Sequence, residues 1–140
     1  MKHRCGQDYL FEKLLKKDKN RCCGCGMKHN TWGMALEADH IYSKSQLKAE
    51  GREDEINFNR KNFHNFQLLC RTCNLTKGNV CFDARYRLKS FKGRISQKTC
   101  LKNKLDFARL IRETKENAWQ DQAFDPGPPP STLSPPTFQR

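Results

Sequence analysis

Two Cys-x-x-Cys pairs are the feature that most limits how this chain can fold. Cys22 and Cys25 form the first pair, Cys70 and Cys73 form the second, and 44 residues separate them. A Cys-x-x-Cys turn directs two thiolates at one ion, and two such turns supply the four ligands of tetrahedral zinc. The spacing therefore predicts a closed structural zinc site that ties off a long loop and contributes folding free energy.

The cysteine pattern leaves other arrangements open. The eight cysteines of this 140-residue chain are alternatively buried or free thiols, or disulfides if the protein is exported. Cys23 competes with Cys22 for the first pair, although one intervening residue fits ligand spacing poorly, and His29 is an alternative ligand. Three cysteines have no partner at metal spacing and are expected to act as small apolar residues: Cys5, Cys81 and Cys100.

Charge narrows the class of partner. Lys and Arg number 27 against 15 Asp and Glu, a formal net charge of +12, while only 36% of residues are hydrophobic. This balance favours a polyanionic partner such as nucleic acid, with a basic protein that binds none as the alternative. The bases concentrate in residues 80–104, where they interleave with Phe82, Tyr86 and Phe91. Apolar anchors beside cationic groups suit contacts to a phosphate backbone.

The sequence argues against membrane association. No apolar run approaches the roughly 18 residues of a membrane span. The N-terminal residues MKHRCGQDYLF also lack the apolar stretch of a secretory signal. We therefore expect an intracellular protein, cytoplasmic if the source is prokaryotic or a phage, with an organelle as the alternative.

Composition and periodicity divide the chain into four segments. Residues 1–20 are expected to hold a packing helix, residues 21–82 the cysteine-rich core, and residues 83–120 a basic segment with a C-terminal helix. Residues 121–140 contain all six prolines and are expected to form a disordered tail, because they cannot bury enough apolar surface to become ordered.

Apolar spacing predicts two helices that flank a core with two short strands. In the first helix, over residues 8–17, four apolar residues share a face: Leu10, Phe11, Leu14 and Leu15. In the second, over about 101–119, four others form a stripe: Leu101, Leu105, Ala108 and Ile111. The segments ALEADHIY (35–42) and NFQLLC (65–70) are predicted strands, and AEGREDEINFN (49–59) a loop. The pattern predicts a small α+β fold.

The order of motifs resembles a known family. Cys-x-x-Cys is followed by Asp39-His40-Ile41 and then by NFQLLCRTCNLTKGN at residues 65–79. This order resembles the HNH endonucleases, members of the ββα-metal (His-Me finger) nucleases, which read DHI followed by NLQxLCxxCNxxKG. Phe66 replaces the usual leucine. The resemblance implies that residues 21–82 form a ββα-metal (HNH) core stapled by the four-cysteine zinc site.

The resemblance also implies roles for four residues. Asp39 would give a carboxylate to a divalent cation, and Asn74, where many members have histidine, would give a neutral oxygen. Such hard oxygen ligands suit Mg²⁺ or Mn²⁺. His40 would be the general base, and Asn65 would hold the loop or orient His40. The alternatives are a surface turn for Asp39-His40 and capping or turn roles for the two asparagines.

Basic residues near these motifs are candidates for contact with phosphate. Lys44, soon after the DHI motif, and Lys77, in the second cysteine motif, would approach the phosphate that is cut. His64 is read as a residue for local packing or for contact with the DNA backbone. Five further bases would grip the duplex through its phosphates: Arg85, Arg87, Lys89, Lys92 and Arg94.

The sequence thus predicts a metal-dependent HNH-type DNA endonuclease that hydrolyses phosphodiester bonds and leaves a 5′-phosphate and a 3′-hydroxyl. One small site cuts one strand at a time, so double-strand cleavage requires a homodimer, an accessory protein or two successive nicks. The alternative is a non-catalytic, zinc-stabilised module that binds nucleic acid. Double-stranded DNA is the expected partner, and RNA remains open because phosphate contacts do not depend on the sugar.

Overall fold

The computed structural model describes residues 5–123. The proline-rich segment falls outside this range from residue 124 onward, and residues 121–123 belong to the last helix. The elements are, in chain order, α1 (Cys5–Lys17), β1 (Glu37–His40), α2 (Lys44–Ala49), η1 (Glu53–Glu55), η2 (Phe63–Asn65), β2 (Phe66–Leu69), α3 (Arg71–Lys77), η3 (Arg85–Ser90) and α4 (Gln97–Ala123).

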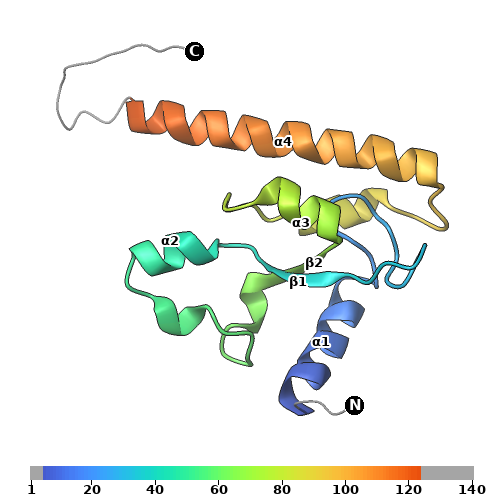
Figure 1. Ribbon diagram of the computed structural model, residues 1–140, viewed down its shortest axis with the longest axis horizontal. Coiled ribbons are helices and arrows are strands. Elements are labelled where there is room, and N and C mark those ends of the chain that lie inside the picture. The colour runs from blue at the N-terminus through green and yellow to red at the C-terminus, as the bar shows by residue number, and fades with distance from the viewer. Residues whose placement is uncertain (1–4, 124–140) are drawn as a thin grey trace.

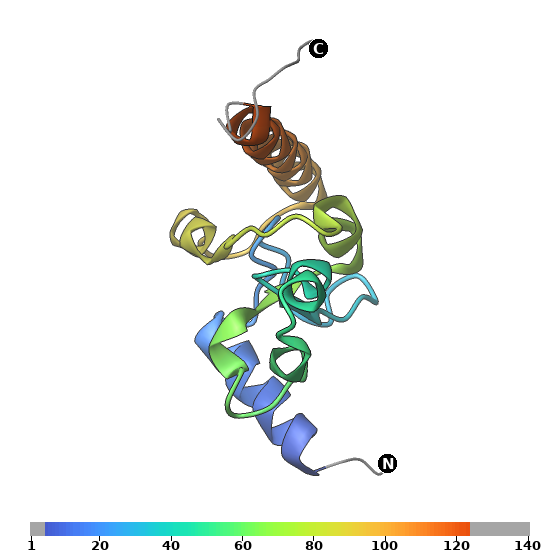
Figure 2. The ribbon, with the colours of Figure 1, turned by 90° about the vertical axis from the view of Figure 1, so that its left-hand side faces the viewer.

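A two-stranded sheet forms the centre of the molecule. β1 and β2 pair antiparallel, with Glu37 opposite Leu69 and His40 opposite Phe66. Figures 1 and 2 show the same order of layers, from α4 through α3 and the sheet to α1. Because helices cover both faces of β2, all four of its residues are buried, and the predicted α+β organisation is confirmed.

The N-terminal helix α1 uses the face that its apolar spacing predicts. Leu10 and Leu14 are buried in the core, and Phe11 and Leu15 pack against it. Helix α2, by contrast, was not anticipated in the sequence. Its N-cap is Ser43, whose Oγ accepts a hydrogen bond from the main-chain N–H of Gln46 at 3.1 Å, a contact typical of helix starts.

The predicted stripe on α4 is wrong for its first half. Leu101 and Leu105 are 62% and 73% exposed, whereas Cys100, Phe107 and Ile111 are buried. The buried residues recur at one helical face, and this face packs on the first cysteine turn. Packing of the Phe107 ring against the first cysteine turn therefore determines which face of α4 is buried.

No helix within residues 5–123 has the length and apolarity needed to cross a membrane.

The four cysteines of the two pairs meet in the interior. Their sulfur atoms all lie within 4.8 Å of one another, and all four residues are buried. Tetrahedral zinc with sulfurs at about 2.3 Å requires sulfurs roughly 3.8 Å apart, and the sulfurs of Cys25 and Cys70 are separated by 3.8 Å. The cluster is therefore compatible with structural zinc.

Hydrogen bonds from main-chain N–H groups are also compatible with zinc in this cluster. The sulfur of Cys22 accepts hydrogen bonds from the N–H groups of Gly24 at 3.3 Å and Cys70 at 3.2 Å. Such donors stabilise thiolate rather than thiol. Contact with the sulfur of Cys22 raises the pKa of Cys25 and Cys73, so a cation is what would allow all four groups to ionise together.

The other cysteines with described side chains lie outside the cluster. Cys23 points to the carboxylate of Asp18, with its sulfur 3.5 Å from Oδ2, and burial raises its pKa. Its competition with Cys22 is thereby resolved in favour of Cys22. Cys100 is buried, as expected of a small apolar residue, and His29 accepts a hydrogen bond from the N–H of Leu36 instead of joining the sulfurs.

A buried carboxylate links the N-terminal helix to three other parts of the chain. Asp18 is 0% exposed. Its Oδ2 accepts from the main-chain N–H of Leu68 at 2.9 Å, and its Oδ1 lies 3.4 Å from Nε of Arg85. Asp18 thus joins α1, the first cysteine turn, β2 and η3. Arg85 is half-buried in this pair, so it serves the fold.

We expect Cys70→Ser to lower bound metal and melting temperature together, because a hydroxyl replaces one of four soft ligands. Cys23→Ser is the matched control, since Cys23 is equally buried but outside the cluster. It should retain about one metal ion per chain. Elemental analysis and thermal unfolding measure both effects. A Cys70→Ser protein with full metal content would contradict the four-cysteine site.

Asp18→Ala should reduce the free energy of unfolding by about 3 kcal/mol, because it leaves the buried N–H of Leu68 without an acceptor and Arg85 without its counter-charge. Glu12→Ala, an exposed substitution on α1, should change stability by less than about 0.5 kcal/mol. Urea unfolding at neutral pH compares the two. Equal effects would show that Asp18 does not link these elements.

Candidate functional site

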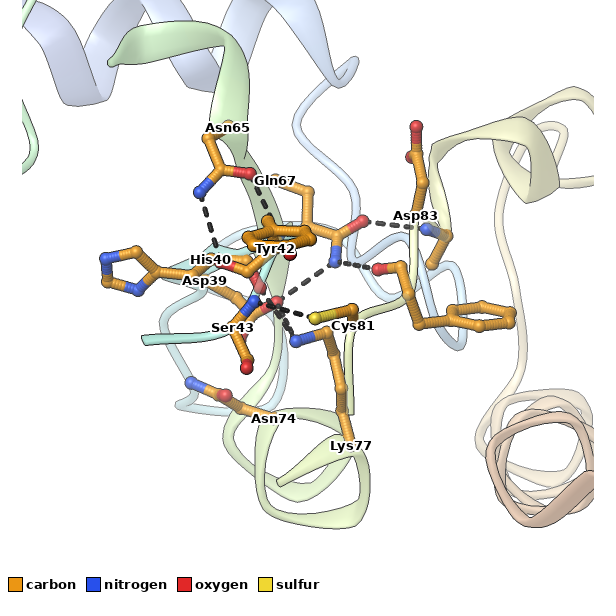
Figure 3. Close-up of polar contacts among 12 residues, drawn as sticks. Asp39, His40, Tyr42, Ser43, Asn65, Gln67, Asn74, Lys77, Cys81 and Asp83 are labelled. Carbon is orange, nitrogen blue, oxygen red and sulfur yellow. Dashed lines mark hydrogen bonds and ion pairs between the residues drawn. The ribbon is translucent and has the colours of Figure 1, made fainter. Parts of the chain in front are cut away.

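The residues singled out by the DHI and NFQLLCRTCN motifs lie around one end of the sheet (Figure 3). Asp39 and His40 are the last two residues of β1, Asn65 ends η2 and Asn74 lies within α3. Antiparallel pairing of β1 with β2 brings the first three together. Among the described side chains of this set, no hydrogen bond joins Asp39, His40 and Asn74 directly to one another.

Asp39 is the most buried acidic residue of this region, with 7% of its surface exposed. Its Oδ2 accepts a hydrogen bond from Nε2 of Gln67 at 3.0 Å and lies 3.2 Å from Nζ of Lys77. Burial raises the pKa of the carboxyl above its ordinary value, and Lys77 partly opposes that shift. The other oxygen, Oδ1, makes no hydrogen bond within residues 5–123, which leaves it free to ligate.

Lys77 occupies a different place from the one expected. It is 1% exposed, and its Nζ donates to the main-chain carbonyl of His40 at 2.7 Å while it pairs with Asp39. An ammonium group without water needs such partners, because an unpaired buried charge is costly. Lys77 therefore fixes the end of β1 from the interior (Figure 3) and is not a surface contact for phosphate.

Gln67 is a residue of the site that sequence reasoning missed. It is fully buried, and its Nε2 donates both to Asp39 and to the carbonyl of Phe82 at 2.9 Å. Its Oε1 accepts from the N–H of Ala84 at 2.8 Å. This side chain orients the Asp39 carboxylate and ties the chain after α3 to the sheet. The available signal was a lone polar residue within the otherwise apolar strand FQLL.

The imidazole of His40 is held in one orientation. Its Nε2 lies 2.7 Å from the carbonyl oxygen of Ile56, and the ring packs on Phe66 with 4.6 Å between centroids. A carbonyl oxygen only accepts, so Nε2 carries the hydrogen and Nδ1 of the neutral ring is the unprotonated nitrogen. His40 is half-buried. The arrangement leaves Nδ1 as a proton acceptor.

Asn65 holds the segment that follows His40. Its Oδ1 accepts from the N–H of Tyr42 at 2.8 Å, and its Nδ2 donates to the carbonyl of the same residue at 3.2 Å. Its own carbonyl accepts from the N–H of Ile41 at 2.8 Å. Three hydrogen bonds from one residue to two consecutive residues fix the backbone just after His40, which is the loop-holding contact expected of Asn65.

Asn74 presents its amide oxygen. Its Nδ2 donates to Oε1 of Glu37 at 2.8 Å, which fixes the amide plane, and its Oδ1 makes no hydrogen bond to any described residue. Asp39 and Asn74 therefore offer one carboxylate and one amide oxygen, a donor set that suits Mg²⁺ or Mn²⁺ with water and phosphate completing the shell. Within residues 5–123, the four cysteines are the cluster of His, Cys, Asp and Glu that could hold a metal.

The bases predicted to grip DNA divide into two groups. Arg87 belongs to the fold together with Arg85, because its guanidinium donates to the carbonyls of Gly24 at 2.7 Å and Asn103 at 3.3 Å. Their expected role as surface phosphate contacts is therefore not what their packing shows. The other predicted bases are exposed: Lys44, Lys89, Lys92 and Arg94.

A second basic surface lies between α1 and η2. A cleft of about 690 Å³ there is lined by five basic residues beside Leu10 and Phe63: Lys13, Lys16, Lys17, Arg60 and His64. Nζ of Lys17 stands 4.9 Å from the centre of the Phe63 ring, and burial lowers its pKa. The sequence identified only the apolar face of this helix, because spacing along the chain cannot show that Arg60 lies beside its lysines.

Comparison with known proteins gives a family match over part of the chain. Residues 21–80 match the HNH endonuclease family, which is less than half of the chain. Comparison with curated proteins and with solved structures gives no significant match. The matched segment contains the four-cysteine cluster, both strands, α3 and the residues around Asp39 and His40. The family match over residues 21–80 therefore agrees with the HNH endonuclease family that the sequence motifs resemble.

Proposed function

We propose that the protein is a metal-dependent endonuclease that hydrolyses phosphodiester bonds in double-stranded DNA. The observation that carries the proposal is His40, whose imidazole is fixed through Nε2 with Nδ1 left as an acceptor, at the end of the strand that also holds Asp39. A general base needs a fixed ring with a free nitrogen near neutral pH. The HNH match supports nuclease chemistry in this segment.

In the proposed reaction, Nδ1 of His40 takes a proton from a water molecule while the oxygen of that water attacks the phosphorus. The new P–O bond forms while the bond to the 3′ oxygen breaks. The 3′ oxygen leaves with that electron pair and takes a proton from solvent, which gives a 5′-phosphate and a 3′-hydroxyl. Asn65 holds the backbone beside His40 during this step. Mg²⁺ or Mn²⁺, held by Asp39 and Asn74, would neutralise the charge that develops on the phosphate and the leaving oxygen.

Lys77 and Gln67 act as positioning residues in this proposal. Both bind Oδ2 of Asp39 from the interior, so the carboxylate is oriented before a cation or a substrate arrives. Preorganised charge is effective because no reorganisation is required at the moment of reaction. Zinc in the four-cysteine cluster would serve the fold alone, since all four sulfurs are buried.

A non-catalytic module that binds nucleic acid is the second candidate. One observation favours it: the ammonium group of Lys77 already neutralises Asp39, as a purely structural ion pair would. Such a module would keep the cysteine cluster and the exposed bases and would use Asp39 and His40 only for packing. The proposal includes RNA as an alternative substrate to DNA. It also includes a homodimer or an accessory protein as the means of double-strand cleavage.

His40→Ala should reduce the nicking of supercoiled plasmid by at least about 100-fold, because it removes the proton acceptor. The wild-type protein, loaded with zinc, should require added Mg²⁺ or Mn²⁺ for nicking. His64→Ala is the matched control, since this exposed histidine is separate from the proposed chemistry. Melting temperature should be unchanged in His64→Ala, and His40→Ala should keep its DNA affinity while its melting temperature falls slightly through loss of the ring contact with Phe66. Full activity of His40→Ala would exclude it as the base, and tight binding without any nicking would favour the binding module.

Replacing both Lys89 and Lys92 with Gln should weaken DNA binding for all sequences. If each contacts one phosphate, the slope of log K against log salt concentration should fall by about 1.8. Arg87→Gln should instead lower the melting temperature with little change in the slope, because its guanidinium is committed to main-chain carbonyls. Binding titrations at several salt concentrations separate the two cases. A larger change of slope for Arg87→Gln would reverse the assignment.

A further inference from the structure

We propose that a cleft beside the first cysteine turn binds one unpaired nucleotide, with the base stacked on Trp32 and the phosphate held by Arg94 and Lys28. The inference rests on the proposed nucleic-acid substrate and extends it with a site outside the HNH motifs. The cleft has a volume of about 820 Å³ and lies between residues 26–32 and residues 93–97. Sites for small molecules commonly measure about 300–1,000 Å³.

The backbone around Trp32 is unusual for a tryptophan. The N–H of Met34 donates to the carbonyl of Thr31 at 3.0 Å, and the two residues between them, Trp32 and Gly33, have φ angles of +52° and +74°. A tight hairpin turn with two positive φ angles strongly favours Asn-Gly. A bulky residue pays a conformational penalty in this position, so packing of the turn does not explain the tryptophan.

The ring of Trp32 is also available to a ligand. The residue is 41% exposed, which is high for a residue type that is largely buried on average, and it lines the cleft. An exposed ring face beside cationic groups is the arrangement on which unpaired bases stack, whatever their sequence. Stacking of a base on this ring requires no hydroxyl or carboxylate group of the protein, because every base has a π face.

The charges of the cleft fit a phosphate. Arg21 lines the cleft and is only 5% exposed. Its guanidinium donates to the carbonyls of Gly26, at 2.8 Å, and Gly93, and within the described part of the chain no carboxylate pairs with it. Lys28 and Arg94 are exposed at the edge. Three positive groups without a lining acid produce a potential that attracts an anion.

The cleft and the proposed cutting site lie at opposite ends of β1. The Trp32 turn precedes Glu37, the first residue of the strand, whereas His40 is the last. Three residue steps of a strand span roughly 10 Å. The proposed nucleotide would therefore lie at least that distance from the bond that is cut, and it would hold a strand that is locally unpaired there.

Fluorescence tests the site directly. The chain has two tryptophans, so Trp119→Phe leaves Trp32 as the only tryptophan reporter. The full-length, zinc-loaded protein is titrated without Mg²⁺ with a 12-residue oligothymidine, with the same strand lacking its bases, and with oligouridine and oligodeoxyuridine. Quenching by the strands that carry bases, and not by the abasic strand, is expected. Oligouridine compared with oligodeoxyuridine, which differs from it only at the 2′ position, shows whether the site distinguishes the sugar.

Trp32→Asn in the same background separates stacking from packing, with binding followed by anisotropy of labelled strands. It should weaken binding of oligothymidine by about 10-fold, leave binding of the abasic strand within about two-fold, and keep or raise the melting temperature because Asn suits the turn. Tyr9→Ala, which removes another exposed aromatic residue, should leave both affinities within about two-fold. Unchanged oligothymidine affinity of Trp32→Asn, equal losses on both strands, or a lowered melting temperature would overturn the site.

Plasmid nicking by the wild type, measured separately, keeps the two proposals apart. Suppose that the wild type nicks plasmid but Trp32→Asn gives one of the overturning results above. The nucleotide site is then wrong, and the endonuclease proposal stands. Selective loss of oligothymidine binding in a protein that never nicks supports the site and contradicts the endonuclease.

Discussion

The meeting of four cysteine sulfurs is the interaction on which the rest of the structure depends. The first pair lies before β1 and the second opens α3, so their contact closes the segment that contains the whole sheet. A chain with 36% hydrophobic residues has little apolar surface with which to pin such a loop, and a metal would supply what the core lacks. Because Cys70 and Cys73 fix α3, Asn74 and Lys77 of the same helix are placed beside β1.

The second constraint is the buried polar network at the end of β1. Asp39 meets Gln67 and Lys77 there, and each of these also binds the main chain: Gln67 at Phe82 and Ala84, Lys77 at His40. Each of these side chains has a hydrogen-bond or ion-pair partner, so a low-dielectric setting makes the network rigid rather than unstable. One arrangement thus orients the carboxylate, anchors the chain after α3 and fixes the strand that bears His40. The same contacts serve stability and the proposed chemistry.

The large positive charge of the chain is only partly a binding surface. Arg21, Arg85 and Arg87 all point inward, to main-chain carbonyls or to Asp18. Arginine suits this use because its planar group donates in several directions and stacks on aromatic rings, as the Arg87 guanidinium does over Phe91 and Phe107. The charge left for a polyanion lies on exposed residues of η3, the segment after it, and α1. Net charge alone therefore overstates the part of the basic segment that is free to bind.

The sequence by itself determined the features encoded at short range: two Cys-x-x-Cys turns, the two strands, the apolar face of α1, and the Asp39–His40 and Asn65 positions that the HNH motifs carry. Each depends on spacing between near neighbours, which periodicity and ligand geometry make readable. Only the tertiary structure decided which face of α4 is buried, that Lys77 and Arg87 point inward, that Gln67 orients Asp39, and that Trp32 shares a cleft with Arg94. These depend on segments distant in the chain meeting in space, where the burial of a charge or a ring is set by its new neighbours and not by its own propensity.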